Sequence, residues 1–260
     1  MIPRSERDGV RRAVEALLES SSTLFITGAG VSADSGLPTY RGVGGLYDVE
    51  TTSEGYAIEE ILTAETLQHD PALTWKHLLE IGKACHGATF NRAHQIIAEA
   101  ETCFERVLVL TQNVDGFHTE AGSKKVIDIH GDMRELVCTR CDFRECVSSD
   151  SEPRIPPPCP QCDSVVRPDI VLFGEMLPAH KSERLYNELR MGFDVVFSIG
   201  TSSLFEYIAW PIHLAKDTGK CTVEINPVET SVSSLVDIRI PLGASAALEQ
   251  IWDHYRRMRA

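Results

Sequence analysis

The sequence contains no apolar run long enough to span a membrane, and its first residues lack the apolar core of a signal peptide. Positive charge is also scarce, since 25 Lys and Arg residues stand against 38 Asp and Glu residues for a net charge of −13. An extended nucleic-acid interface needs clustered Lys and Arg, so we expect neither a sequence-specific nucleic-acid partner nor a membrane partner. These absences predict a cytoplasmic protein, whose eight cysteines serve metal or thiol chemistry rather than disulfides.

Internal repeats and long low-complexity tracts are missing as well, and 260 residues suffice for one large core with a smaller satellite module. Buried apolar runs predict strands near 23–27, 106–111, 125–129, 193–199, 221–225 and 237–241. Apolar residues at helical spacing occur between these runs, over 6–20, 53–86, 91–103 and the C-terminal segment. This alternation predicts an α/β fold with a parallel sheet covered by helices.

A glycine turn follows the first predicted strand, where Gly28, Ala29 and Gly30 lead towards Ser32. The pattern G-x-G-x-x-A is an accepted variant of the dinucleotide fingerprint, because its glycines let a backbone approach a pyrophosphate and the following residues open a helix. A plain tight connection is an equally good reading of these residues alone. The second strand and acidic residue of an ordinary Rossmann unit are replaced by a Gly-rich loop over 35–45. This departure disfavours a plain dehydrogenase and suggests a closing loop beside the site.

Polar side chains follow two later strands. Gln112, Asn113, Val114 and Asp115 come directly after the second predicted strand, and His130 ends the third. Ligands bind beyond the carboxyl ends of strands in open α/β sheets, so these side chains are placed to read an amide and ribose hydroxyls. The alternative is a helix cap, with Asn113 or Asp115 accepting backbone N–H groups. A histidine at such a strand end is a candidate for acid–base chemistry near neutral pH.

Four cysteines form the strongest local motif. Cys138 and Cys141 make one C-x-x-C pair, and Cys159 and Cys162 make a second pair, with 17 residues between the two. This spacing matches a zinc ribbon, and four thiolates leave no open coordination position, so the metal is expected to be structural. Cys146 lies between the pairs and fits neither.

Taken together, these motifs resemble the sirtuins, the NAD-dependent protein lysine deacylases, in their order along the chain from about residue 20 to 250. The matching stretches are 28–32, 35–41, 111–115, 130–131, the four cysteines, 173–175, 200–202 and Asn226. Any one of these stretches can occur by chance in an unrelated protein, whereas the whole set in this order is specific for the family. The loop over 39–45 is most similar to the bacterial, class III-like branch of the family.

The resemblance implies a Rossmann-like, NAD-binding domain with helices on both faces of its sheet, formed by 1–45, 104–133 and 165–260. A helical insertion over 46–103 and a zinc ribbon over 134–164 would form a small domain, with NAD bound in the cleft between the two. NAD as co-substrate and one structural zinc ion are the implied cofactors.

The resemblance also implies roles for individual residues. His130 would act as general base on a ribose hydroxyl, while Asn113 and Asp115 would orient the nicotinamide amide. The residues implied in NAD binding are Gly28, Ala29, Gly30, Ser32, Tyr40, Arg41, Gln112, Asn113, Val114, Asp115, Gly200, Thr201, Ser202, Asn226 and Ala244. The residues implied in binding an acyl-lysine protein or peptide are Val171, Phe173, Gly174, Glu175 and Ser203.

The implied reaction converts NAD and acyl-lysine into nicotinamide, O-acyl-ADP-ribose and free lysine. An ADP-ribosyltransferase or NAD glycohydrolase on the same scaffold is one alternative, and a zinc-ribbon module that holds a nucleotide without turnover is another. His130 disfavours the first alternative, because the deacylase cycle needs that base.

The sequence departs from the resembling branch at the acyl-binding positions. Desuccinylases of that branch recognise an acidic acyl group with a Tyr and an Arg three residues apart, and the corresponding positions here are Leu78 and Ile81. Two apolar side chains cannot hold a carboxylate, so we expect a preference for neutral acyl groups, acetyl or longer, over succinyl. Tyr40, and Glu206 with Tyr207 after the Gly-Thr-Ser turn, are further departures with no predicted effect.

Overall fold

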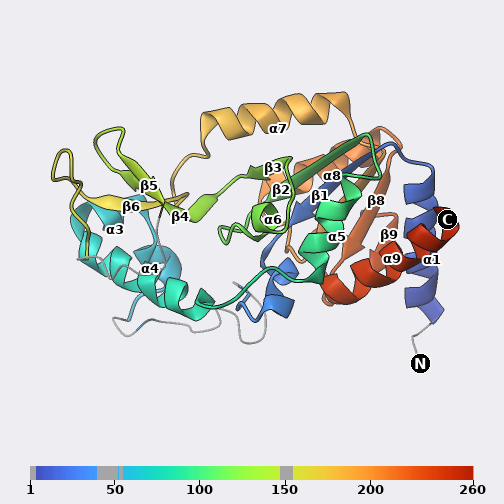
Figure 1. Ribbon diagram of the computed structural model, residues 1–260, viewed down its shortest axis with the longest axis horizontal. Helices are drawn as coiled ribbons and strands as arrows, with labels where there is room; N and C mark the ends of the chain where they lie inside the picture. Colours follow the sequence, from blue (N-terminus) through green and yellow to red (C-terminus); the bar gives the residue numbers. More distant parts are fainter. Residues whose placement is uncertain (1–3, 40–51, 53–54, 147–154, 260) are drawn as a thin grey trace.

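The computed structural model describes residues 4–39, 52, 55–146 and 155–259. Its largest element is a six-stranded parallel sheet with the strand order β3-β2-β1-β7-β8-β9 (Figure 1). The strands are β1 (Ser22–Thr27), β2 (Arg106–Thr111), β3 (Val126–Asp128), β7 (Val195–Ile199), β8 (Cys221–Ile225) and β9 (Ile238–Ile240). Each overlaps a strand predicted from a buried run, and the α/β class is confirmed.

Helices cover both faces of this sheet, because side chains alternate between the faces along each strand. In β1, Phe25 belongs to the hydrophobic core on one face, whereas Leu24 and Ile26 belong to the core on the other. The helices of the first core are α1 (Arg4–Leu18), α5 (Arg92–Ala100) and α9 (Ala244–Arg259). Those of the second core are α7 (Ala179–Met191) and α8 (Glu206–Asp217). Burial on both faces explains why these strands appear in the sequence as continuous apolar runs.

A second, smaller sheet lies at the other end of the molecule (Figure 1). It is antiparallel, in the order β5-β4-β6, with β4 (Gly131–Cys138), β5 (Arg144–Cys146) and β6 (Val166–Ile170). The helices beside it are α2 (Ile58–Ile61), α3 (Ala64–His69) and α4 (Pro71–Cys85). Asp70 caps α4 by accepting the Leu73 N–H, and Trp75 Nε1 donates to the Val166 carbonyl at 2.8 Å, which fastens α4 to β6.

Helix α5 corrects one predicted domain boundary. The sequence places it within the helical insertion over 46–103, whereas Ala93, Ile96 and Ile97 are buried in the core that α1 and α9 share with the large sheet. The apolar spacing predicts the helix itself but not the sheet that it covers. The rest of the predicted division into domains stays a prediction.

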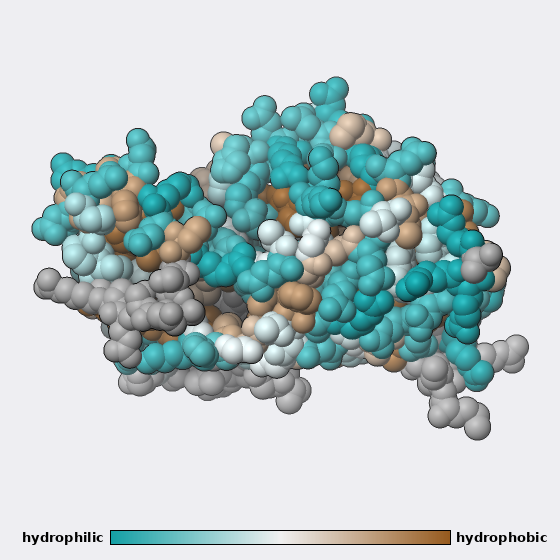
Figure 2. Space-filling view, viewed as in Figure 1, coloured by the Kyte–Doolittle hydropathy of each residue, from teal (hydrophilic) through white to brown (hydrophobic). Residues whose placement is uncertain are grey.

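The strand order reverses between β1 and β7, since β2 and β3 extend the sheet on one side and β8 and β9 on the other. In open α/β sheets such a switch point leaves a crevice at the carboxyl ends of the strands. Figure 2 shows a face that is mostly hydrophilic, with hydrophobic residues exposed in the region between the small sheet and the large one. No helix in the described part of the chain has the length and apolar character needed to cross a membrane.

Candidate active site

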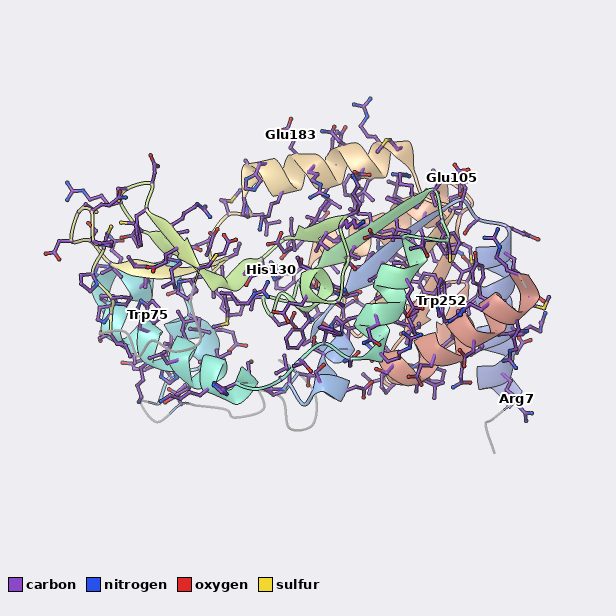
Figure 3. All side chains as sticks on the ribbon, in the orientation of Figure 1. Arg7, Trp75, Glu105, His130, Glu183 and Trp252 are labelled. Carbon is purple, nitrogen blue, oxygen red and sulfur yellow. The ribbon has the colours of Figure 1, made fainter. Side chains whose placement is uncertain are left out.

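A cavity of about 730 Å³ opens at this switch point and reaches the small sheet and its helices. His130 lies between the part of the molecule that carries Trp75 and the part that carries Trp252 (Figure 3). The predicted site residues that line the cavity are Gly28, Ala29, Gly30, Gln112, Asn113, Val114, His130, Val171, Phe173, Gly174, Glu175, Gly200, Thr201, Ser202, Asn226 and Ala244. The fold therefore brings residues from seven separate stretches of the chain to one cavity.

Two glycine turns, one after β1 and one after β7, touch each other at the cavity wall. The Gly30 N–H donates to the Gly200 carbonyl at 2.8 Å, and a Cβ on Gly30 would lie 2.6 Å from the Gly200 Cα. Only glycine allows this approach. The helix expected after the first turn is replaced by two short 3₁₀ turns, η1 (Ala29–Val31) and η2 (Ala33–Ser35).

Polar side chains join the carboxyl ends of β2, β7 and β8 behind these turns. Gln112 Nε2 donates to Thr201 Oγ1 at 2.7 Å, and Asn226 Nδ2 donates to the Thr201 carbonyl at 3.1 Å. Asn226 Oδ1 accepts the Val228 N–H at 3.2 Å. The amide groups of Gln112 and Asn226 thus fix the shape of the cavity wall as well as lining it.

A buried chain of hydrogen bonds holds Asn113. Its Nδ2 donates to Ser32 Oγ at 3.1 Å, and Ser32 Oγ donates to Asp115 Oδ2 at 2.7 Å. Asp115 Oδ1 also accepts the Phe117 N–H, so the helix-cap alternative holds for this residue, and burial raises the pKa of its carboxyl. Ser32 and Asp115 lie behind the cavity wall rather than on it. Within the described residues, buried Asn113 Oδ1 has no hydrogen-bond partner, which leaves it available to a ligand amide.

His130 is held from two sides. Its Nδ1 lies 3.1 Å from the Gln112 carbonyl, which can only accept, so Nδ1 carries a proton. Its Nε2 lies 2.6 Å from the Tyr207 hydroxyl. Burial lowers the pKa of His130, the positive charge of Lys181 acts in the same direction, and the Gln112 carbonyl opposes both. The neutral imidazole, with a lone pair on Nε2, is the form suited to a general base.

An apolar part of the wall comes from the helices beside the small sheet and from the segment after β6. Leu62, Leu78, Ile81, Met133 and Phe173 line the cavity here and belong to one hydrophobic cluster. The Phe173 N–H donates to the Leu62 carbonyl at 2.8 Å, which joins the two parts. The two positions that the sequence associates with acyl recognition, 78 and 81, therefore lie at the cavity.

The segment after β6 is fixed by its own contacts. The Val171 N–H donates to the His130 carbonyl at 2.8 Å, which ties this segment to the end of β3. The Glu175 carboxylate binds the Arg167 guanidinium at 2.5 and 2.9 Å and accepts the Leu172 N–H at 2.8 Å. Glu175 therefore stabilises the turn that presents the segment, a function that the sequence did not indicate.

Of the other predicted residues, Ser203 lies away from the cavity and two fall outside the described residues, and several cavity residues were not predicted. Ser203 is buried, with its Oγ 3.2 Å from Ser198 Oγ, and does not line the cavity. Tyr40 and Arg41 fall outside the described residues. Phe205 and Tyr207 do line the cavity, and the only sequence signal for them was their position after the Gly-Thr-Ser turn.

The four predicted zinc ligands come together at one end of the small sheet. Their four sulfur atoms all lie within 4.8 Å of one another. The Cys138 and Cys162 sulfurs are 3.5 Å apart, and the Cys141 and Cys159 sulfurs are 3.6 Å apart. A tetrahedral zinc ion with Zn–S bonds of about 2.3 Å puts its sulfurs about 3.8 Å apart, which fits this cluster. Backbone N–H groups also point at two of the sulfurs. Four-thiolate coordination makes this zinc structural.

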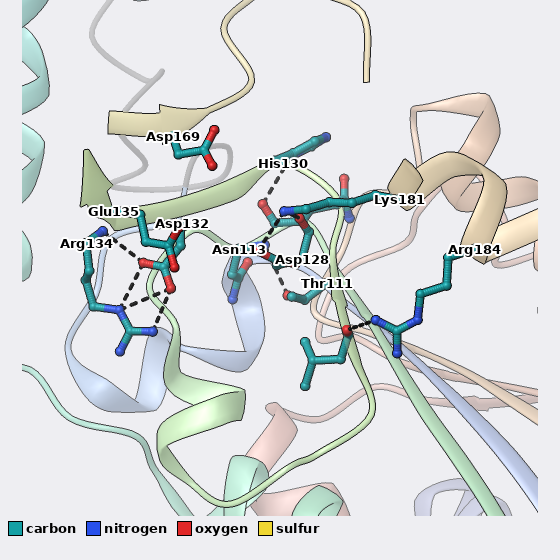
Figure 4. A network of polar contacts seen from close by, with 12 residues as sticks. Thr111, Asn113, Asp128, His130, Asp132, Arg134, Glu135, Asp169, Lys181 and Arg184 are labelled. Atoms are coloured by element: carbon teal, nitrogen blue, oxygen red, sulfur yellow. Dashed lines mark hydrogen bonds and ion pairs between the residues drawn. The ribbon is translucent and has the colours of Figure 1, made fainter. Parts of the chain in front are cut away.

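A larger hollow of about 1810 Å³ is lined by residues of β4, β6, α3 and α6 (Phe117–Glu120). Charged side chains around it pair with one another: Arg134 binds Asp132 at 2.6 Å, and Lys181 binds Asp128 at 2.8 Å (Figure 4). Neither glycine turn lines this hollow, and nor does His130. The smaller cavity is therefore the candidate active site.

Comparisons with known proteins find relatives over nearly the whole chain. A family model described as the Sir2 family matches residues 28–206. The "NAD-dependent protein deacylase 2" of Pseudomonas aeruginosa is 43% identical over 251 residues, which cover 95% of this chain and 98% of that protein. A solved Sir2 homolog–NAD complex has a TM-score of 0.85 at 34% identity and covers 96% of this chain and 95% of its own. A Sir2–p53 peptide–NAD⁺ structure has a TM-score of 0.80 at 26% identity, and the match covers 94% of this chain and 98% of that one.

Proposed function

The chain belongs to the Sir2 family and is an NAD-dependent protein deacylase, and from this premise we propose that it acts on acyl-lysine in the cavity beside His130. The products would be nicotinamide, O-acyl-ADP-ribose and free lysine. The observation that carries the proposal is the single cavity in which a neutral histidine meets the glycine turns on one part of the wall and apolar side chains on another. The Pseudomonas aeruginosa relative is named a deacylase, which disfavours an ADP-ribosyltransferase or NAD glycohydrolase.

The glycine turns suit the phosphates of NAD. Gly28, Gly30 and Gly200 have no side chains to keep a phosphate from the backbone, and Ser202 adds a hydroxyl at the same wall. Asn226 and Ala244 line the cavity beyond β8 and would meet the adenosine half. We assign Tyr40 and Arg41, which lie outside the described residues, to closing over the cofactor.

Asn113 suits the nicotinamide end. Its buried Oδ1, without a partner among the described residues, would accept the amide N–H of the nicotinamide. Ser32 and Asp115 would act through Asn113 by holding its Nδ2, because neither lies on the cavity wall. Asp115 is therefore assigned here as a residue that positions Asn113.

His130 would take the proton. When bound, NAD supplies a ribose carbon that becomes electrophilic as nicotinamide leaves, together with neighbouring hydroxyl groups. His130 would accept the proton of one of those hydroxyls at Nε2, while its Nδ1–H stays on the Gln112 carbonyl. The apolar wall around Leu78 and Phe173 would hold the acyl chain and keep water away from it.

Acyl-lysine proteins or peptides are the proposed substrates. The related Sir2–p53 peptide–NAD⁺ structure combines a peptide with the dinucleotide. In this chain the segment of Val171, Phe173 and Gly174 leads from β6 to the cavity and is the proposed place for an extended peptide. We place the enzyme in the cytoplasm and expect neither nucleic acid nor membrane as a partner, in line with its net charge of −13.

The test is release of nicotinamide from NAD with and without an acetyl-lysine peptide, followed by mass spectrometry of the products. We expect release to require the peptide and to be matched by acetyl-ADP-ribose. His130→Asn should lower kcat about 100- to 10,000-fold without lowering the thermal midpoint by more than a few degrees, because it removes a general base. Peptide-independent release, ADP-ribose attached to protein, or full activity of His130→Asn would contradict the proposal.

A further inference from the structure

Tyr207 lines the cavity, and the proposed reaction gives it no role. It lies in the first turn of α8, and its hydroxyl is 2.6 Å from His130 Nε2. Its ring stacks on Phe205 with centroids 5.4 Å apart, and the Phe205 ring meets the imidazole edge-on at 5.9 Å. Two aromatic side chains from the segment after β7 therefore enclose the exposed side of the proposed base.

The hydrogen bond uses the atom that the reaction needs. Because Nδ1 donates to the Gln112 carbonyl, Nε2 of the neutral ring has one lone pair and no proton. That lone pair accepts the Tyr207 O–H. A ribose hydroxyl that gives its proton to Nε2 must occupy the same direction, so it cannot bind there while Tyr207 remains.

Tyr207 lies at the edge of the cavity. Phe205 is 42% exposed, whereas Tyr207 is half-buried and its ring also packs against the core that α7 and α8 share with the large sheet. Burial raises the pKa of Tyr207 to about 12, which keeps the hydroxyl protonated and a hydrogen-bond donor at neutral pH. Moving the hydroxyl off Nε2 exchanges one hydrogen bond of Nε2 for another, at the cost of shifting a ring that also packs against that core.

We propose that Tyr207 is a positioning residue that occupies His130 Nε2 in the ligand-free enzyme and is displaced by a ribose hydroxyl of the bound nucleotide. The bond keeps the imidazole in the orientation and tautomer that the reaction uses. Its loss on binding lowers the affinity for the nucleotide. This inference rests on the proposed function of His130.

The test is a double-mutant cycle with ADP-ribose as the probe, measured by titration calorimetry. Tyr207→Phe keeps the ring on Phe205 and removes only the hydroxyl, so we expect ADP-ribose to bind about 2- to 10-fold more tightly. In a His130→Ala background the same change should leave the affinity for ADP-ribose unaltered. The reason is that Nε2, the atom for which the Tyr207 hydroxyl and the ribose hydroxyl compete, is absent. Tyr186→Phe, at an exposed tyrosine on α7 outside the cavity, is the matched control. It should leave the affinity for ADP-ribose unaltered in both backgrounds.

Weaker or unchanged binding by Tyr207→Phe, or an equal change in both backgrounds, would overturn the proposal. So would a fall in kcat with unaltered ADP-ribose affinity, which would make Tyr207 a proton carrier.

Imidazole ¹⁵N NMR gives a second readout that does not depend on deacylation. The His130 signals, assigned by their loss in His130→Asn, should shift at Nε2 in Tyr207→Phe and in the wild type on adding ADP-ribose. No shift at Nε2 would overturn the proposal. If instead the wild type releases no nicotinamide with acyl-lysine peptide but the shifts occur, the proposed function fails while the contact between Tyr207 and His130 stands.

Discussion

At the scale of single residues, Lys181 influences His130 without touching it. It lies at the start of α7, bonded to Asp128 at 2.8 Å, and its positive charge lowers the pKa of the imidazole in addition to burial (Figure 4). A general base works only when neutral, so activity should persist below the ordinary histidine pKa of about 6.5 and fall as the pH drops through the lowered value.

Lys181→Met should therefore move the acidic limb of the kcat/KM profile to higher pH. The change removes a positive charge and leaves the Asp128 carboxylate unpaired, and both effects favour the imidazolium and raise the pKa of His130. The variant should lose activity at pH 6 while it approaches the wild-type rate at pH 8. Arg184→Met is the control, because Arg184 on the same helix donates to the Val126 carbonyl and is not among the groups that shift His130. A limb that stays in place, or moves to lower pH, would show that Lys181 does not act on the base.

At the scale of elements, the small sheet connects the cysteine cluster to the active site. β4 begins directly after His130, and β6 leads into the segment of Val171 and Phe173. Zinc bound by the cysteines therefore fixes the far ends of strands whose near ends line the cavity. Structural zinc contributes on the order of 10 kcal/mol to the folding of small modules.

Removing zinc with a chelator should abolish deacylation and leave the large sheet folded. The cores on the two faces of the large sheet contain none of the four ligands, so far-UV circular dichroism should keep most of its signal. Cys138→Ser should have the same effect, and Cys146→Ser should have none, because Cys146 is exposed and lies outside the cluster. Full activity in protein shown by metal analysis to be zinc-free would contradict the assigned role.

The same elements show what the sequence can and cannot predict. Strands buried on both faces are continuous apolar runs, so β1, β2 and β7 were predictable from local pattern. The strands of the small sheet are half-exposed and irregular, with a register shift between Asp132 and Leu136, and only the cysteine spacing revealed their neighbourhood. Helix α5 was predictable as a helix, but its place on the large sheet depends on contacts with α9, which local pattern does not contain.

At the scale of the whole molecule, the active site depends on the meeting of segments far apart in the chain. The residues after β1, β2, β3 and β7 were predictable as one site because carboxyl ends of parallel strands share an edge of the sheet. The bond between His130 and Tyr207 joins residues 77 positions apart, and no local pattern marks it. Motif and topology together thus indicated more of the residues on the proposed nucleotide side of the cavity than of those that surround His130.

The acyl side of the cavity forms where helices beside the small sheet meet the segment after β6. Leu78 and Ile81 on α4 are joined there by Leu62, Met133 and Phe173, all apolar. A succinyl carboxylate buried among them would have no cation to pair with among these five side chains, at a cost of at least about 3 kcal/mol. Because 1.36 kcal/mol is a tenfold change in rate, acetyl-lysine peptide should exceed succinyl-lysine peptide by about 100-fold or more in kcat/KM.

The double variant Leu78→Tyr/Ile81→Arg tests whether these two positions set the preference. It supplies a hydroxyl and a guanidinium one helical turn apart on α4, the pairing that a carboxylate needs. We expect kcat/KM for succinyl-lysine peptide to rise at least tenfold and that for acetyl-lysine peptide to fall, measured on peptides of one sequence. Leu78→Met/Ile81→Leu keeps the wall apolar at similar volume and should retain the acetyl preference. A wild type that favours succinyl-lysine would mean that a cation from outside the described residues reaches this wall.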